Sequence, residues 1–317
     1  MRNTSTIADE PHMNGVLVID KPAGLTSHDV VNRVRRILGQ KAVGHMGTLD
    51  PMATGVLPLV VGNLTRLAQF YTASEKRYEG VIRFGFATDT YDAEGTPSGP
   101  AQTVEVSLEQ VRDLAGRFRG VIEQTPPPFS AKKIQGVPAY KLARKKRAVA
   151  LQPVQVEIKE FEILGVEGEC ASFRARVGSG TYMRSVAHDM GQILGCGAHL
   201  HSLCRTAVGE FSLAEAHGLD ELAAAAESGN TEGLFVHPRK LLPEFPSVAA
   251  TEETAARIRA GRSVNLPDLS KAKLVKVFYG QSELIAIATR IAGTLFHPKI
   301  VLAGEASLQL AGPQKGG

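Results

Sequence analysis

A single aspartate, Asp50, follows a glycine-rich stretch and precedes a long apolar run in the segment GHMGTLDPMATGVLPLVVG, Gly44–Gly62. Glycine and proline punctuate residues 41–51, so we expect a loop there that enters a buried strand at Gly55–Gly62. A carboxylate held rigidly in such a loop could form a covalent adduct or remove a proton. The alternative is that Asp50, which stands before Pro51, only initiates a turn, as aspartates often do.

The chain lacks the common signatures of cofactor binding. VGSGTYM contains GxG without a third glycine, and no GxxxxGK[ST], GxSxG or HExxH occurs. The cysteines Cys170, Cys196 and Cys204 form no CxxC pair. His199 and His201 lie near Cys204, but a zinc site needs about four well-placed ligands. We therefore predict reduced thiols, no metal and no cofactor.

The elements around Asp50 can be read from local patterns. GVLVID, Gly15–Asp20, is of strand type and ends at a turn. Ser27 is expected to be a helix N-cap, and Gly39 ends the helix. Apolar residues recur between them with helical spacing, at Val30, Val31, Val34, Ile37 and Leu38. The helix should therefore turn its arginines outward.

Strands and helices alternate irregularly through the next part of the chain. We expect strands at 77–86, 154–164 and 170–177, and helices opening at Ser107 and near Thr181. The second helix should direct inward Met183, Val186, Ala187, Met190, Ile193 and Leu194. Because no regular βαβ repeat occurs, the pattern predicts an α+β or mixed α/β fold.

The last third of the chain predicts a domain boundary. Residues 213–242 are rich in Ala, Leu and Glu and are expected to be helical, and LPEFP then breaks the pattern. A short helix at Glu252–Ala260 precedes four apolar runs, LVKVF, LIAIAT, GTLF and KIVL. Several short strands of this kind are typical of a small β-barrel.

Length and composition limit the number of domains and the kinds of targeting or membrane segments that the chain can contain. A chain of 317 residues favours one large domain and one small one. The first twelve residues have neither a basic start nor an apolar core, so we expect a loose tail at 1–12 and no signal peptide. The longest apolar runs are far short of the roughly 20 residues of a membrane span. We expect a cytoplasmic protein that does not enter a membrane.

The net charge of +4 is small, but basic residues cluster. One cluster comprises Arg33, Arg35, Arg36 and Lys41, and the other Lys141, Arg144, Lys145, Lys146 and Arg147. The second cluster is compatible with a solvated helix face and with an RNA-binding surface.

Five ordered segments resemble the successive motifs of the TruB family of pseudouridine synthases. They are GVLVIDKPAGLTSHDVV, GHMGTLDPMATGVLPLVVGNLTR, KRYEGVIRFGFATDTYDAEG, PPPFSAKKIQGVPAYKLAR and GSGTYMRSVAHDMGQILGCGAHLHSL. The resemblance spans about residues 14–205. It implies a central mixed sheet flanked by helices, in a catalytic domain at 13–245, and uridine 55 in the T loop of tRNA as the target. The part at 246–312 resembles, more weakly, a small RNA-binding domain of the PUA type.

The resemblance also implies roles for individual residues. Asp50 matches the family's catalytic aspartate, and His45 matches a histidine that helps to open the T loop. Tyr78 matches a tyrosine that stacks on the flipped base. Tyr182 and Arg184 match the tyrosine and arginine of the GTYxR motif, and Leu203 matches an apolar residue of the same pocket. Where some relatives read LRR, this chain reads Leu203-Cys204-Arg205, which puts a phosphate contact in doubt.

Pseudouridine formation moves the sugar from nitrogen 1 to carbon 5 of uracil without gain or loss of electrons. No cofactor is needed, in agreement with the missing signatures. Arg184 near Asp50 would keep that carboxylate charged in a dry pocket. Lys21, Lys133 and the basic segment from Lys141 are candidates for the phosphate contacts that offset base flipping.

Two alternatives to the interpretation as a pseudouridine synthase of the TruB type exist. The chain could be a tRNA-binding folding chaperone for which opening the T loop matters more than chemistry, but Asp50 favours an enzyme. A guide-RNA-dependent relative is disfavoured because the chain lacks long basic extensions. We expect the T stem-loop of tRNA as the partner, a monomer, and no obligate protein partner.

Overall fold

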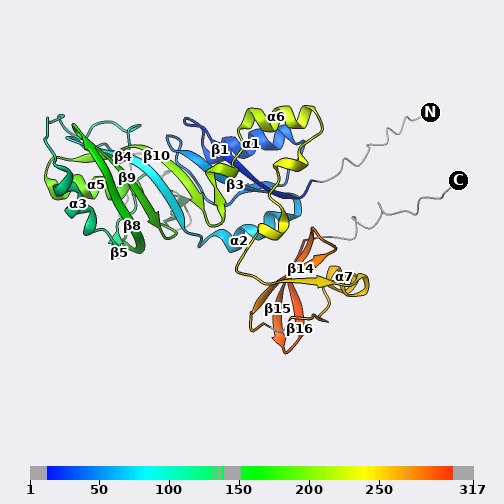
Figure 1. The fold of residues 1–317 in the computed structure, drawn as a ribbon. Coiled ribbons are helices and arrows are strands. Elements are labelled where there is room, and N and C mark those ends of the chain that lie inside the picture. The colour runs from blue at the N-terminus through cyan, green and yellow to red at the C-terminus, as the bar shows by residue number, and fades with distance from the viewer. Residues whose placement is uncertain (1–12, 131–132, 135–136, 139–150, 269, 303–317) are drawn as a thin grey trace.

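The structure, a computed structural model, describes residues 13–130, 133–134, 137–138, 151–268 and 270–302. The predicted tail at 1–12 and the basic segment from Lys141 to Arg147 lie outside these residues. The described chain forms an elongated N-terminal part built on one large sheet and a smaller C-terminal part built on a second sheet (Figure 1).

The large sheet has nine strands within the described residues. Seven follow the order β1 (Gly15–Lys21), β3 (Thr54–Val61), β10 (Ala198–Val208), β4 (Lys76–Phe84), β9 (Cys170–Val177), β8 (Val154–Glu167) and β5 (Gly120–Gln124). The short strands β2 (Val43–His45) and β11 (Phe211–Ser212) pair with β3 and β10. β3 and β10 are parallel, whereas the other pairs are antiparallel. The predicted mixed sheet is confirmed.

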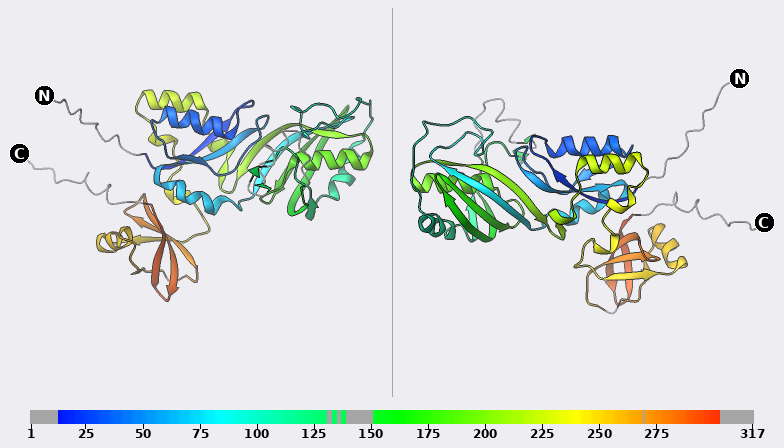
Figure 2. Two further views of the ribbon diagram at one scale, coloured as in Figure 1. Left: turned by 180° about the vertical axis from the view of Figure 1, so that it is seen from behind. Right: turned by 45° about the horizontal axis from the view of Figure 1, so that its top comes forward.

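Helices cover the two ends of this sheet (Figure 2). At one end α1 (Ser27–Ile37) and α6 (Leu219–Glu227) lie side by side near β1 and β3. At the other end α5 (Met183–Leu194) packs on β10 and α3 (Leu108–Gly116) packs on β8. The remaining helical turns and the small hairpin are η1 (Gly62–Leu67), α2 (Ala68–Tyr71), η2 (Leu213–Glu215), η3 (Glu232–Leu234), η4 (Pro238–Lys240), β6 (Lys133–Ile134) and β7 (Val137–Pro138).

The start of α1 differs from the prediction by one residue. The N-cap is Thr26, whose side chain accepts from the Asp29 N–H while the Asp29 carboxylate accepts from the Thr26 N–H. This reciprocal pair is a capping box, so Ser27 is left free for another partner. The Ser27 hydroxyl instead contacts the backbone of Leu49, in the loop of Asp50.

Other predictions were wrong in their extent. Ile193, expected to face inward from α5, is 52% exposed. In the stretch 213–242, only α6 is an α-helix among otherwise short 3-10 turns and extended chain. The loop expected at 41–51 contains β2 at Val43–His45. The strands at 77–86, 154–164 and 170–177 are confirmed to within a few residues.

The C-terminal part is a curled sheet of five strands in the described residues. Their order is β12 (Ser247–Ala250), β14 (Leu274–Tyr279), β15 (Glu283–Ala292), β16 (Leu295–Val301) and β13 (Val264–Asn265), with α7 (Glu252–Arg259) against them. The two runs GTLF and KIVL form one strand, β16. The sheet is a half-barrel, because β12 and β13 at its ends do not pair in the described residues.

The two parts share an apolar cluster. Phe278, Leu284 and Ile287 from the C-terminal sheet pack in the same buried group as Leu67 and Tyr71 from the N-terminal part. None of the described helices is long and apolar enough to span a membrane.

Candidate active site

The loop of Asp50 is held along its backbone. It lies between β2 and β3, and the Ser27 hydroxyl both accepts from the Leu49 N–H (2.8 Å) and donates to the Leu49 carbonyl (3.1 Å). On the other side of Asp50, the Lys21 ammonium donates to the Pro51 carbonyl at 3.0 Å. Asp50 therefore projects from a loop fixed on both sides of it.

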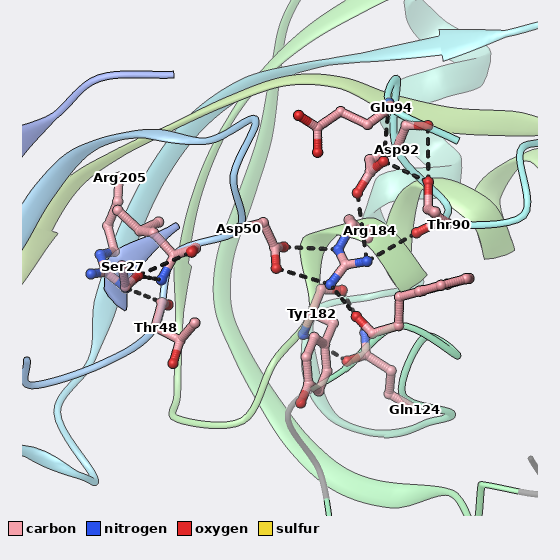
Figure 3. Close-up of polar contacts among 12 residues, drawn as sticks. Ser27, Thr48, Asp50, Thr90, Asp92, Glu94, Gln124, Tyr182, Arg184 and Arg205 are labelled. Carbon is pink, nitrogen blue, oxygen red and sulfur yellow. Dashed lines mark hydrogen bonds and ion pairs between the residues drawn. The ribbon is translucent and has the colours of Figure 1, made fainter. Parts of the chain in front are cut away.

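Arg184, in the first turn of α5, pairs with Asp50 (Figure 3). Its Nε lies 2.8 Å from the Asp50 Oδ2, and its Nη2 donates to Oδ1 at 3.0 Å. The remaining guanidinium contacts are to the carbonyls of Thr90 and Phe129, each at 3.0 Å, and to Asp92 at 3.5 Å. The Arg184 side chain is 4% exposed. The predicted proximity of Arg184 and Asp50 is confirmed.

Asp92 is a second carboxylate at the site, and no role for it was predicted from the sequence. It is buried, and its Oδ1 accepts from the Thr90 hydroxyl at 2.6 Å and from the Glu94 N–H at 3.1 Å. Tyr91, between Thr90 and Asp92, adopts a left-handed backbone with φ 66° and stacks on His188 of α5 at 3.7 Å between ring centroids. Such backbone strain persists where surrounding contacts dictate it. The stack thus fixes the Asp92 loop to the helix that carries Arg184.

A cavity of about 260 Å³ opens beside Asp50. Tyr78 of β4, Leu203 of β10 and Tyr182 line it together with Asp50 and Arg184. Burial raises the pKa of the Tyr78 hydroxyl above its usual value, and the charge and hydrogen bond of Arg205 oppose this rise. The structure therefore brings five of the sequence-predicted site residues together around one cavity.

Tyr182 is held in this wall by its backbone. Its N–H donates to the Gln124 side chain at 2.8 Å and its carbonyl accepts from the same side chain at 3.1 Å. Gln124 is buried at the end of β5. This double contact joins the chain before α5 to the edge of the large sheet.

A second cavity, of about 680 Å³, opens on the other side of Asp50 and is lined in part by His45, Glu94 and Phe129. Burial lowers the pKa of His45, with smaller effects from the charges of Arg205 and His28. The ring is therefore neutral at pH 7. Its Nδ1 accepts weakly from the Gly47 N–H at 3.4 Å, which leaves the proton on Nε2.

Lys21 has a different place from the predicted one. It is 0% exposed, and its ammonium donates to the carbonyls of Pro22, Leu25 and Pro51 at 2.7–3.0 Å. Burial lowers its pKa to about 8, with Asp50 and Glu94 opposing. The ammonium faces the interior and binds the active-site loop, and a phosphate contact by Lys21 stays a prediction. The Lys133 side chain and the segment from Lys141 lie outside what the structure describes.

Two cations at the smaller cavity were not predicted. Lys76, two residues before Tyr78, lines the cavity, and burial together with the charge of Arg205 lowers its pKa to about 8. Arg205, which the sequence analysis noted only beside a missing arginine, is 1% exposed and also lines the cavity. Side chains two residues apart on a strand point to the same face of the sheet. Lys76 lies two residues from Tyr78, and Arg205 lies two residues from Leu203, so this spacing could have identified both.

Within the described residues, no group of three or more His, Cys, Asp or Glu side chains is arranged to hold a metal ion. The arrangement is instead one partly exposed carboxylate, Asp50, paired with a buried guanidinium and flanked by aromatic and apolar walls. Such a carboxylate can act on a flat molecule inserted into the smaller cavity.

Two family models match the chain. Residues 35–183 match the N-terminal domain of the TruB family pseudouridylate synthases, and residues 184–242 match the tRNA pseudouridylate synthase B C-terminal domain. The chain is 50% identical to the tRNA pseudouridine synthase B of Solibacter usitatus over 92% of its own length and 100% of that protein. The chain belongs to the TruB family of pseudouridylate synthases.

Further relatives and solved structures agree with this family. The tRNA pseudouridine synthase B of Geobacter sulfurreducens is 43% identical over 78% of this chain and 82% of that protein. A chain of a Cbf5-Nop10-Gar1 complex superposes with a TM-score of 0.69 at 25% identity, covering 92% of this chain and 86% of its own. The fold is that of a pseudouridine synthase, as the motifs of this TruB family member implied.

The burial of Arg184 leads to a stability prediction. Arg184→Met removes the only cation in contact with buried Asp92 among the described residues, so we expect the free energy of unfolding to fall by about 3–5 kcal/mol. Arg83→Met is the matched control, because its partner Glu169 and Arg83 itself are half-exposed and the expected loss is about 0–1 kcal/mol. Urea unfolding of both variants measures the difference. Equal losses in the two variants would contradict the structural role of Arg184.

Proposed function

We propose that the chain isomerises uridine to pseudouridine at position 55 in the T loop of tRNA, with Asp50 as the catalytic carboxylate. The observation that carries this proposal is the ion pair of Asp50 with buried Arg184 beside a cavity lined by Tyr78 and Leu203. The names of the curated relatives, tRNA pseudouridine synthase B, support tRNA as the substrate.

The reaction breaks the bond from C1′ of the ribose to N1 of uracil and forms a bond from C1′ to C5. The hydrogen on C5 leaves as a proton, N1 gains a proton, and no electrons are exchanged. Asp50 either attacks as a nucleophile or removes a sugar proton, which divides one difficult step into easier ones. Arg184 holds the carboxylate through its ion pair while RNA excludes water from the cavity.

The cavity walls suit a base taken out of its stack. Tyr78 presents an aromatic face and Leu203 an apolar one, and stacking on such surfaces offsets the few kcal/mol that flipping requires. His45 and Tyr182 stand at the two cavities that meet at Asp50. We assign His45 to the opening of the T loop and Tyr182 to the wall of the base pocket.

The proposal also assigns separate functions to two domains of the chain. Residues 13–245 form the catalytic domain, and residues 246–312 form a PUA-like RNA-binding domain. The boundary falls next to β12, which starts at Ser247. The protein would work in the cytoplasm as a monomer, without an obligate protein partner.

Replacement of Asp50 separates catalysis from RNA binding. Asp50→Asn should form no measurable pseudouridine while tRNA affinity stays within about threefold, because phosphate contacts supply most of the binding. The assay is tritium release from uridine labelled at C5 in a T-loop minihelix. Glu79→Gln, at an exposed carboxylate on β4, is the control and should keep the wild-type rate. Product from Asp50→Asn would refute the assignment, and T-loop remodelling by this variant would reveal the chaperone activity.

Tyr78 has two separable properties, a stacking face and a hydroxyl. Because burial keeps the hydroxyl protonated, it can donate a proton during the rearrangement. Tyr78→Phe should then keep tRNA affinity but lose a factor on the order of 10² to 10⁴ in single-turnover rate. Tyr78→Ala should lose affinity as well. A Phe variant within about threefold of the wild-type rate would restrict Tyr78 to stacking.

Deletion of residues 246–317 tests the domain proposal. The truncated protein should bind tRNA more weakly but form pseudouridine slowly at the correct site, because every residue of the candidate site precedes residue 246. It should also unfold at a lower temperature, since Leu67 and Tyr71 lose apolar partners. A truncated protein that is folded by circular dichroism but inactive at saturating tRNA would contradict the division.

A further inference from the structure

Arg205 occupies the centre of the large sheet. Across β10 it pairs with Gly55 of β3 on one side and with Tyr78 of β4 on the other. Residues paired across neighbouring strands direct their side chains to the same face, so Arg205 and Tyr78 lie next to each other beneath the smaller cavity. The position is set by the register of three strands that are far apart in the sequence.

The guanidinium of Arg205 joins the two ends of the Asp50 loop. Nη2 donates to the Gly47 carbonyl and Nη1 to the Thr48 carbonyl, both at 3.1 Å, and Nε donates to the Val56 carbonyl at 2.8 Å. Gly47 and Thr48 precede Asp50, and Val56 follows it at the start of β3. One rigid planar group therefore fixes the span of backbone from which Asp50 projects.

The same guanidinium acts on the other side of the cavity. Tyr78 is its neighbour across β10 and β4, and burial lowers the Arg205 pKa while Tyr78 and Asp50 oppose that lowering. Arg205 thus lies next to both Tyr78 and the loop of Asp50, which line the same cavity.

Stability alone does not account for a charge in this position. Within the described residues, no carboxylate lies within ion-pair distance of Arg205, although the side chain is 1% exposed. Burying a charge costs several kcal/mol, and well-packed apolar side chains of similar volume are often as stable. Arg184, in contrast, has two carboxylate partners. The contacts of Arg205 point to a geometric task at the site.

We propose that Arg205 is a positioning residue that sets the Asp50 carboxylate relative to the Tyr78 hydroxyl, an inference that rests on the proposed function. A displacement of about 1 Å at a reacting group can cost on the order of 10²-fold in rate. Arg205→Met should therefore lower the single-turnover rate at saturating tRNA by about that factor, with tRNA affinity within about threefold. Arg205→Lys should fall between Met and wild type, because one ammonium cannot hold all three carbonyls.

The control is Arg119→Met in the large sheet's own domain. Arg119, between α3 and β5, donates through Nε and Nη2 to the Phe161 carbonyl of β8 and lines neither cavity beside Asp50. Its loss should leave the single-turnover rate at saturating tRNA unchanged. The comparison separates the loss of a guanidinium that binds a backbone carbonyl elsewhere in the large sheet from the loss of Arg205.

Hydrogen exchange supplies a readout that does not depend on turnover. Peptides covering residues 46–53 should exchange faster in both Arg205 variants than in wild type and in Arg119→Met. If wild type releases no tritium, the proposed function fails, and the exchange result still decides whether Arg205 fixes the loop. Folded Arg205→Met with a rate within about threefold of wild type, or with unchanged exchange, would overturn the inference. If Arg205→Met does not fold, the same criteria apply to Arg205→Lys.

Discussion

Burying a guanidinium costs least when its charge is balanced and its N–H groups are matched, and Arg184 meets both conditions. Its partners come from three separate segments: the loop of Asp50, the turn at Thr90 and Asp92, and the chain at Phe129. None of these segments neighbours another in the sequence. Their positions relative to α5 are therefore set by one side chain, and the two cavities beside Asp50 take their shapes from the same contacts.

The backbone of the Asp50 loop is likewise held by hydrogen bonds to partners within the protein. Every carbonyl from residue 47 to residue 51 has a defined donor, where most surface loops would rely on water. The donors in chain order are Arg205 for Gly47 and Thr48, Ser27 for Leu49, Ala53 for Asp50, and Gly24 and Lys21 for Pro51. Two of these donors are buried cations, so the carboxylate projects from a segment whose movement would leave charges without acceptors. The carbonyls of this loop therefore have hydrogen-bond partners within the protein, as those of a strand do.

The sequence could predict Asp50, Arg184 and Tyr78 as site residues because each stands in a local motif of the TruB family. It could predict the strands because their apolar patterns are local as well. The N-cap was misplaced by one residue because Ser27 is also a favourable cap by residue type, but the acidic residue three positions on, Asp29, completes a capping box with Thr26 and not with Ser27. Ile193 continued the apolar pattern of α5, but its side chain lies on the exposed face of the last turn, whereas Met190 and Leu194 pack on the core.

The roles of Lys21 and Arg205 could not be predicted, since a basic residue in a chain expected to bind RNA is most simply assigned to a phosphate. The backbone carbonyls that these two side chains contact are brought to them by the register of the strands. The parallel pairing of β3 with β10 brings their backbones so close at Gly55 that a Cβ there would lie 2.3 Å from the Arg205 carbonyl oxygen. Glycine is needed at residue 55, with φ +96°, for Arg205 to reach the loop. The glycine of the motif is thus explained by packing that the motif itself does not reveal.

In the proposed reaction the uracil base must turn, while the Asp50 carboxylate beside it must stay in place. The faces of Tyr78 and Leu203, which line the cavity, would hold the base by stacking and dispersion, and these depend little on rotation within the plane of the ring. Asp50, in contrast, is fixed by directional hydrogen bonds through Arg184 and through its backbone. The site therefore combines non-directional contacts where the substrate must move with directional ones where the catalyst must stay in place. An isomerisation that cuts at N1 and rejoins at C5 of the same ring needs that division.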